Sequence, residues 1–183
     1  NGDILANSSK AYGQAGKVEI YVRASQSSDD SVQHSFTLTQ TLTGISADGS
    51  SLNTGFGESL AMTKDGTTLI IGAPGLDNLE QADAGAIYYY KWNADGSTNT
   101  YTLQQTLNAP GTNTNVKFGS TVNINQSGNR IAIGAIGADN TRTMRFDSGA
   151  TTFDLQDTNI VDINREAGVV YAGTKYDTKF IID

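Results

Sequence analysis

The chain has 183 residues, a formal net charge of −7 and no cysteine. The missing cysteines exclude a disulfide framework and a thiolate metal site, and the absence of a basic stripe argues against a nucleic-acid partner. Only 37% of the residues are hydrophobic, and no apolar run reaches the roughly 18 residues that a membrane-spanning helix needs. Abundant Gly, Thr, Asn and Ser are instead typical of many short strands joined by polar loops.

The first predicted strands lie at residues 4–8, 17–22 and 36–42. They are rich in β-branched or aromatic residues and are bounded by turn-forming residues. Residues 1–3 have the composition of a turn, so the printed sequence is interpreted as beginning inside a repeat, as a fragment or a processed product. His34 is the only histidine, and no function is assigned to it because the neighbouring Asp29 and Asp30 are interpreted as loop charges and not as partners for acid–base or metal chemistry.

The next predicted strands, residues 56–61, 69–75, 84–90 and 101–107, form the most complete unit. Lys64-Asp65-Gly66-Thr67 is predicted to be the tight turn between the first two. Because alternate strand residues face opposite ways, Tyr88 and Tyr90 are expected to share one side and Tyr89 the other, each packed against a neighbouring unit. Trp92, at the end of this strand, is the candidate for an exposed aromatic contact.

The last predicted strands lie at residues 118–124, 130–135, 168–172 and 179–182. Phe118-Gly119 repeats Phe56-Gly57 at a spacing of 118 − 56 = 62 residues, and internal repetition at a long period indicates a repeat architecture. Residues 136–167 are interpreted as a long insertion between the second and third strands of this unit. The insertion forms either an extra hairpin or docking arm, or a surface excursion.

Three motifs of the central unit identify a family resemblance. Phe-Gly-x-Ser at residues 56–59, Ile-Gly-Ala-Pro at residues 71–74 and Ala-Gly-Ala-x-Tyr at residues 84–88 resemble the FG-GAP repeat. That repeat is the four-stranded blade of integrin-α-type β-propellers and of many bacterial and phage surface proteins. The resemblance implies an all-β fold, a partial β-propeller of about three four-stranded antiparallel blades, at residues 1–55 (incomplete), 56–117 and 118–183.

Propeller geometry places the loops between second and third strands on the same face as the connections between blades. These loops are long here, at residues 43–55, 108–117 and 136–167, and long loops on a rigid scaffold usually carry contacts. We therefore predict that this face binds a partner. Its candidate binding residues are Asp77, Asn78, Glu80, Asp83, Phe146, Asp147, Phe153 and Asp154.

Because integrin-like repeats bind calcium, the resemblance raises the question of a calcium site. The family places several acids between the first two strands of a blade, whereas the corresponding loops here hold only Asp65, so the family's calcium site does not carry over and no metal site is assigned. The acids at residues 77–83 form either a solvated acidic loop or a weak Ca²⁺ site. We predict no other cofactor.

The predicted function is that of a non-enzymatic structural or interaction module of a larger virion or cell-surface protein. Residues that would mark a catalytic site are missing, since Ser59 lies outside a nucleophile elbow and no carboxylate pair is selected by spacing. Protein partners or further copies or blades would complete the propeller, because closed propellers have typically four to eight blades. Residues at the end of the chain also resemble long structural proteins of tailed phages that infect cyanobacteria. The alternatives are a carbohydrate-binding receptor-recognition appendage and a propeller hydrolase.

Overall fold

The computed structural model describes residues 3–9, 16–23, 35–44, 54–78, 81–93, 99–109 and 113–137, and, as strand backbone, 144–148, 153–156, 169–172 and 178–181. Over these residues the chain forms strands and turns without a helix, which confirms the predicted all-β class. No helix that could cross a membrane occurs in this part of the chain.

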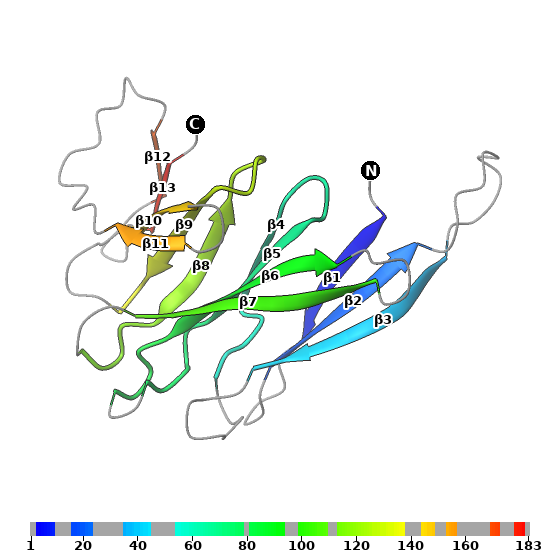
Figure 1. The fold of residues 1–183 in the computed structure, drawn as a ribbon. Coiled ribbons are helices and arrows are strands. Elements are labelled where there is room, and N and C mark those ends of the chain that lie inside the picture. Colours follow the sequence, from blue (N-terminus) through cyan, green and yellow to red (C-terminus); the bar gives the residue numbers. More distant parts are fainter. Residues whose placement is uncertain are drawn as a thin grey trace.

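The strands form three open antiparallel sheets and one separate hairpin (Figure 1). The first sheet has the order β1-β2-β3, the central sheet β4-β5-β6-β7 and the third sheet β11-β10-β9-β8, while β12 and β13 pair with each other. The strands are β1 Ile4–Ser9, β2 Lys17–Arg23, β3 Phe36–Thr43, β4 Ser59–Met62, β5 Thr68–Ala73, β6 Ala86–Asn93, β7 Thr100–Asn108, β8 Phe118–Ile124, β9 Arg130–Ala135, β10 Met144–Ser148, β11 Phe153–Gln156, β12 Val169–Ala172 and β13 Thr178–Ile181.

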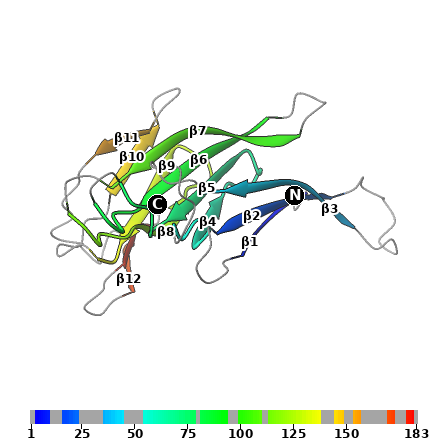
Figure 2. The same cartoon turned by 90° about the horizontal axis from the view of Figure 1, so that it is seen from below.

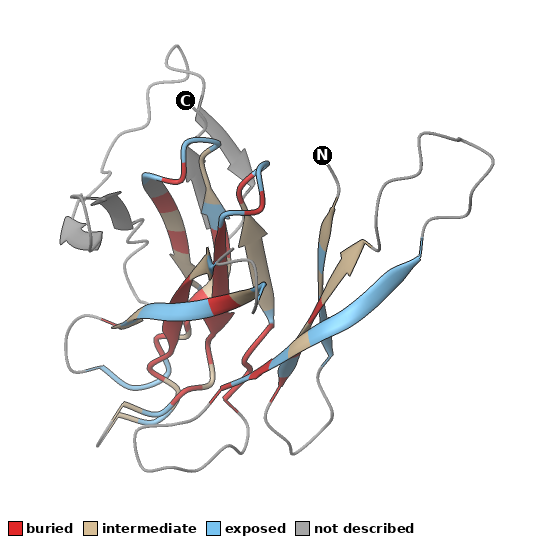
Figure 3. Cartoon of the chain, turned by 45° about the vertical axis from the view of Figure 1, so that its right-hand side comes forward, coloured by how far each residue is buried: buried red, intermediate tan, exposed pale blue. Residues whose placement is uncertain are grey.

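The central sheet lies between the other two, as Figures 1 and 2 both show. Its two faces bury different side chains because successive residues of a strand point to opposite sides. Tyr88 and Tyr90 join the core shared with the first sheet, and Tyr89 joins the core shared with the third sheet, as the alternation predicts. Figure 3 shows buried residues concentrated in the central sheet and its loops, whereas β3 is mostly exposed.

One joint holds each sheet to the one before it. Phe56 and Phe118 are fully buried. The backbone of Phe56 lies against Gly16, which directly precedes β2, and the backbone of Phe118 lies against Gly85, which directly precedes β6. A Cβ atom added to Gly16 would stand 1.7 Å from the Phe56 carbonyl oxygen, and one added to Gly85 would stand 2.2 Å from that of Phe118. Only glycine permits such an approach of two backbones. The Phe-Gly repeat of the sequence is therefore a repeat of sheet-to-sheet contact.

The tight turns between the first two strands of the central and third sheets also pack against the preceding sheet. Gly66 packs over Ile4 of the first sheet, and Gly128 packs over Thr68 of the central sheet. Both glycines have positive φ, 72° and 69°, as the turn requires. The predicted turns and the spacing of the two repeats are confirmed.

The third sheet differs from the prediction. Residues 168–172 were expected to pair with β9, but β9 pairs with β10, with Ile133 opposite Met144 and Ile131 opposite Phe146. β12 pairs with β13, as expected of the last two predicted strands, but the pair lies outside this sheet. The segment 136–167, predicted to be an insertion forming either an extra hairpin or docking arm or a surface excursion, contains the β10–β11 hairpin, and this hairpin supplies the third and fourth strands of the sheet. The physical reason is proximity along the chain: consecutive strands joined by a short connection usually pair.

Candidate functional site

The loop that joins β5 to β6 carries the acidic residues predicted from the sequence. Buried Leu76 anchors its start, where the carbonyl oxygen accepts the Gly85 N–H at 2.9 Å. Asn78 and Gln81 exchange two backbone hydrogen bonds of 3.0 Å. The loop is thus held by its own backbone. Glu80 lies outside the described residues.

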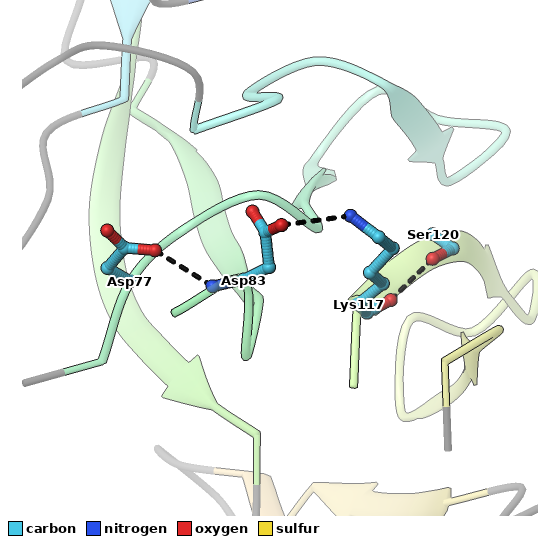
Figure 4. A network of polar contacts seen from close by, with 4 residues as sticks. All are labelled: Asp77, Asp83, Lys117 and Ser120. Atoms are coloured by element: carbon cyan, nitrogen blue, oxygen red, sulfur yellow. Dashed lines mark hydrogen bonds and ion pairs between the residues drawn. The ribbon is translucent and has the colours of Figure 1, made fainter. Parts of the chain in front are cut away.

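Two carboxylates in this loop have specific partners (Figure 4). Asp77 Oδ1 accepts the Asp83 N–H at 2.8 Å, which supports the left-handed backbone of Asp83 at φ 52°. Asp83 Oδ2 lies 3.3 Å from Nζ of Lys117, the residue before β8. Both side chains of this ion pair are about 40% exposed, 39% for Lys117 and 40% for Asp83, so the pair contributes about 0 to 1 kcal/mol.

Backbone hydrogen bonds also join the loop after β5 to the segment before β8. Ala82, Asp83 and Ala84 accept the N–H groups of Asn115, Lys117 and Phe118 at 2.8, 3.0 and 2.9 Å. Lys117 is itself left-handed at φ 55°, and its carbonyl oxygen accepts a hydrogen bond from the Ser120 hydroxyl, as Figure 4 shows. The loop after β5 and the connection before β8 therefore lie against each other. Asp83 joins the two sheets, and Asp77 supports the backbone of Asp83.

The predicted acids do not assemble a metal-ligand group in the part of the chain that the structure describes. A cluster of three or more His, Cys, Asp or Glu side chains does not occur there. Asp77 and Asp83 are close together, but one oxygen of each is engaged by an N–H group or by Lys117.

The other predicted binding residues lie in strands and not in a loop. Asp147 of β10 is opposite Arg130 of β9 on one side and Asp154 of β11 on the other. Phe146 of β10 is opposite Ile131 of β9 and Leu155 of β11, and Phe153 of β11 is opposite Ser148 of β10. These positions are far along the chain from the 77–83 loop, and they belong to the third sheet. The sequence left open whether this segment forms a hairpin, and it did not indicate that the hairpin would pair with β9.

Trp92 is half-buried and not exposed as expected. Its ring meets that of Tyr101 edge to face, with centroids 4.9 Å apart and an interplanar angle of 68°. It thereby closes the end of the core between the first and central sheets. Burial raises the pKa of Tyr90 in this core to about 12, with a smaller contribution from Tyr88, and burial also raises the pKa of Tyr101.

Sequence reasoning also missed two polar contacts between sheets. Gln40 bonds to the backbone of Tyr101, and the Ser59 hydroxyl donates to the Gly119 carbonyl oxygen at 2.7 Å. A signal for the first was present, because the aligned fourth strands carry glutamine at the same position, Gln40 and Gln105.

Comparison with known proteins identifies no family for the chain. No protein-family model matches the chain, and a search of curated proteins finds no significant match.

Proposed function

We propose that the chain is a non-enzymatic structural and interaction module, a partial β-propeller of FG-GAP type within a larger virion or cell-surface protein. Its role is to hold protein segments together, from other copies or from the rest of a longer protein. The repeated packing supports this most directly, because the two buried cores of the described residues each join two successive antiparallel sheets.

The repeated joint supports the propeller part of the proposal. Phe56 against Gly16 and Phe118 against Gly85 bring successive antiparallel sheets face to face in the same way. A repeat protein grows by adding such units, each of which contacts its neighbours. FG-GAP blades have the same motif order as residues 56–88.

The interaction surface in this proposal is the loop side of the stack. Asp83 and Lys117 bring the loop after β5 against the connection before β8, which is how a propeller arranges these two kinds of loop. Their mutual bonds give the surface a fixed shape. A rigid loop surface binds with a smaller loss of conformational entropy than a mobile one.

The mass of the particle in solution tests the proposal. Light scattering at several protein concentrations should give a mass that rises above the 19.3 kDa of one chain towards a multiple of it. The Gln104→Ala variant, changed at an exposed side chain of β7 whose bonds within the described residues go to Thr102, is the control and should behave like the wild type. A mass of one chain at every concentration would contradict assembly.

A further inference from the structure

The outer strands of the first and central sheets, β3 and β7, are not covered by another described strand (Figure 1). The next described strands along the chain, β4 and β8, belong to the following sheets, so connection along the chain does not supply a strand for either outer edge. Long uncovered edges of this kind pair with the edges of other molecules unless something prevents it.

Neither outer strand carries the residues that usually prevent such pairing. β3 has the sequence FTLTQTLT and β7 the sequence TYTLQQTLN, without a charged residue or a proline in either. Leu38 and Leu103 are 48% and 49% exposed. Uncharged strands that are rich in threonine and large apolar residues are typical of segments that aggregate edge to edge. Another feature must therefore keep these edges apart.

The pairing register of the central sheet contains one extra residue in β7. Tyr89 is opposite Gln105 and Tyr90 is opposite Leu103, which leaves Gln104 without a residue opposite it. An extra residue in one strand of an antiparallel pair is a β-bulge, which bends the strand and increases its twist.

The first sheet has the same bulge at the equivalent place. Ile20 is opposite Gln40 and Tyr21 is opposite Leu38, so Thr39 is the extra residue of β3. The feature therefore recurs in both outer strands that lack charges.

The bulge changes the spacing of the backbone groups on the outer edge of β7. Both backbone groups of Tyr101 are bound by a side chain of the first sheet and so point away from β6, whereas the Ala109 N–H points to the Gly85 carbonyl oxygen. Because direction alternates along an antiparallel strand, the groups of Leu103 and Thr106 also point outward. Outward residues normally occur at every second position, but these two are 106 − 103 = 3 positions apart. A regular strand cannot match both sides of the bulge.

A glutamine closes another part of the same edge. Gln40 donates to the Tyr101 carbonyl oxygen at 2.9 Å and accepts the Tyr101 N–H at 2.8 Å. Its amide thus occupies the two backbone groups that a pairing strand would use at Tyr101. Gln40 directly follows the extra residue Thr39, so one short segment of β3 interrupts its own edge and closes part of the edge of β7.

The extra residues are not needed for pairing within their own sheets. If Gln104 were removed, Leu103 would still be opposite Tyr90 and Gln105 would still be opposite Tyr89. Every other pair of β6 and β7 would also keep its register and its face. The effect of the extra residue therefore falls on the outer edge.

We propose that the bulges in β3 and β7, together with the Gln40 amide on Tyr101, keep these strands from pairing edge to edge with a second copy of this chain. A second copy is the partner that these edges exclude, because two identical uncharged strands have no charge repulsion to hold them apart. This inference goes beyond the proposed function, since it states that assembly leaves the outer strand edges unpaired.

Deletion of Gln104 from the full chain tests the inference. At equal concentration, light scattering should give the deletion variant a larger mass than the wild type. Amide hydrogen exchange at Leu103 and Thr106 should slow at least about tenfold as the concentration of the variant rises, the change that about 1.4 kcal/mol of pairing gives. Gln104→Ala keeps the bulge and loses only the side chain, so it should behave like the wild type.

A second change in the deletion variant identifies the surface. Thr106→Pro removes an N–H that points outward and leaves the bonds between β6 and β7 in place. Combined with the deletion, it should return both the mass and the exchange at Leu103 to the wild-type values. Association that survives this change would overturn pairing through the edge of β7.

Deletion of Thr39 repeats the test on β3, with exchange read at Leu38 and Thr41, and urea unfolding shows whether each variant is folded. A folded deletion variant with wild-type mass and exchange would overturn the proposal. Failure of both deletions to fold would overturn it as well, because the bulges would then be required by the sheets themselves. A monomeric wild type beside an associating deletion variant would uphold this inference and contradict the proposed assembly.

Discussion

Gln40 pairs with the backbone of Tyr101 as if it were a neighbouring strand. Its Nε2 donates to the Tyr101 carbonyl oxygen at 2.9 Å, and its Oε1 accepts the Tyr101 N–H at 2.8 Å. The two residues lie on β3 and β7, the fourth-strand positions of successive sheets. A single side chain therefore links the outer strands of the first and central sheets.

Gln40→Ala should destabilise the fold because both backbone groups of Tyr101 lose this partner. We expect a loss of about 1 to 3 kcal/mol in the free energy of unfolding, measured by urea denaturation. Gln104→Ala is the matched control, and exposed changes of this kind usually stay within about 0.5 kcal/mol. Equal stability of both variants would show that the Gln40 contact contributes nothing.

Tyr101→Phe should also be costly. The Tyr101 hydroxyl donates to the Gly66 carbonyl oxygen at 2.6 Å, and the side chain is only 2% exposed. Removing the donor leaves a buried carbonyl oxygen without it, at a cost of about 1 to 3 kcal/mol. Tyr21→Phe removes a hydroxyl that bonds to Glu19 on the outer face and should cost less. Thermal unfolding of the two variants side by side measures the difference.

Gly119→Ala should disrupt the contact between the central and third sheets. Gly119 has φ 87°, and an added Cβ would stand 2.5 Å from the Ala86 carbonyl oxygen. We expect a loss of more than about 3 kcal/mol, from backbone strain and the forced separation of the sheets.

Gly128→Ala provides the comparison for that variant. Its φ is 69°, but the nearest atom to an added Cβ is a Thr63 methyl carbon at 3.2 Å. Strain alone should then cost about 1 to 2 kcal/mol. Near-equal losses in the two variants, by urea denaturation, would show that the sheet contact does not limit stability.

Asp65 should make stability depend on pH in the acid range. Hydrogen bonds from the Thr63 hydroxyl, the Thr67 N–H and the Thr67 hydroxyl lower the pKa of Asp65 to about 2. An aspartate in an unfolded chain has a pKa of about 4. The lowered pKa means that the folded state favours the carboxylate, so the stabilisation is fully present above about pH 4 and is lost as pH falls to about 2.

Asp65→Asn isolates this effect because the amide oxygen still accepts hydrogen bonds. The stability difference between wild type and variant should be largest near neutral pH and should shrink between about pH 4 and pH 2. An NMR titration of the carboxyl carbon should place the pKa of Asp65 at about 2, and Thr63→Val should raise it. A difference in stability that does not change with pH would contradict this origin.

The repeated elements were predictable because their constraints are local. Alternation placed Tyr88, Tyr89 and Tyr90, and the Asp-Gly turn at Asp65 follows from turn chemistry. The third sheet was not predictable in the same way. The Gly-Val-Val-Tyr segment at 168–171 looks like the third strand of the central unit, and only the pairing partner of β9 decides between it and β10.

The candidate site was likewise only partly predictable from the sequence. Composition identified Asp77 and Asp83, but their role depends on Lys117, which lies 34 residues after Asp83. Lys117 takes the left-handed conformation that Gly55 takes in the preceding repeat, with φ of 55° and 66°. A lysine gives no sign of that conformation in sequence, because glycine is the residue expected there.

Hydrogen–deuterium exchange of the whole chain at low and high protein concentration tests the assembly proposal most directly. The account predicts that high concentration protects the loop at residues 77–83, while the buried strand Thr68–Ala73 is protected at both concentrations. Exchange that is identical at both concentrations throughout the chain, together with the mass of a single chain, would contradict the claim that this protein is an assembly module.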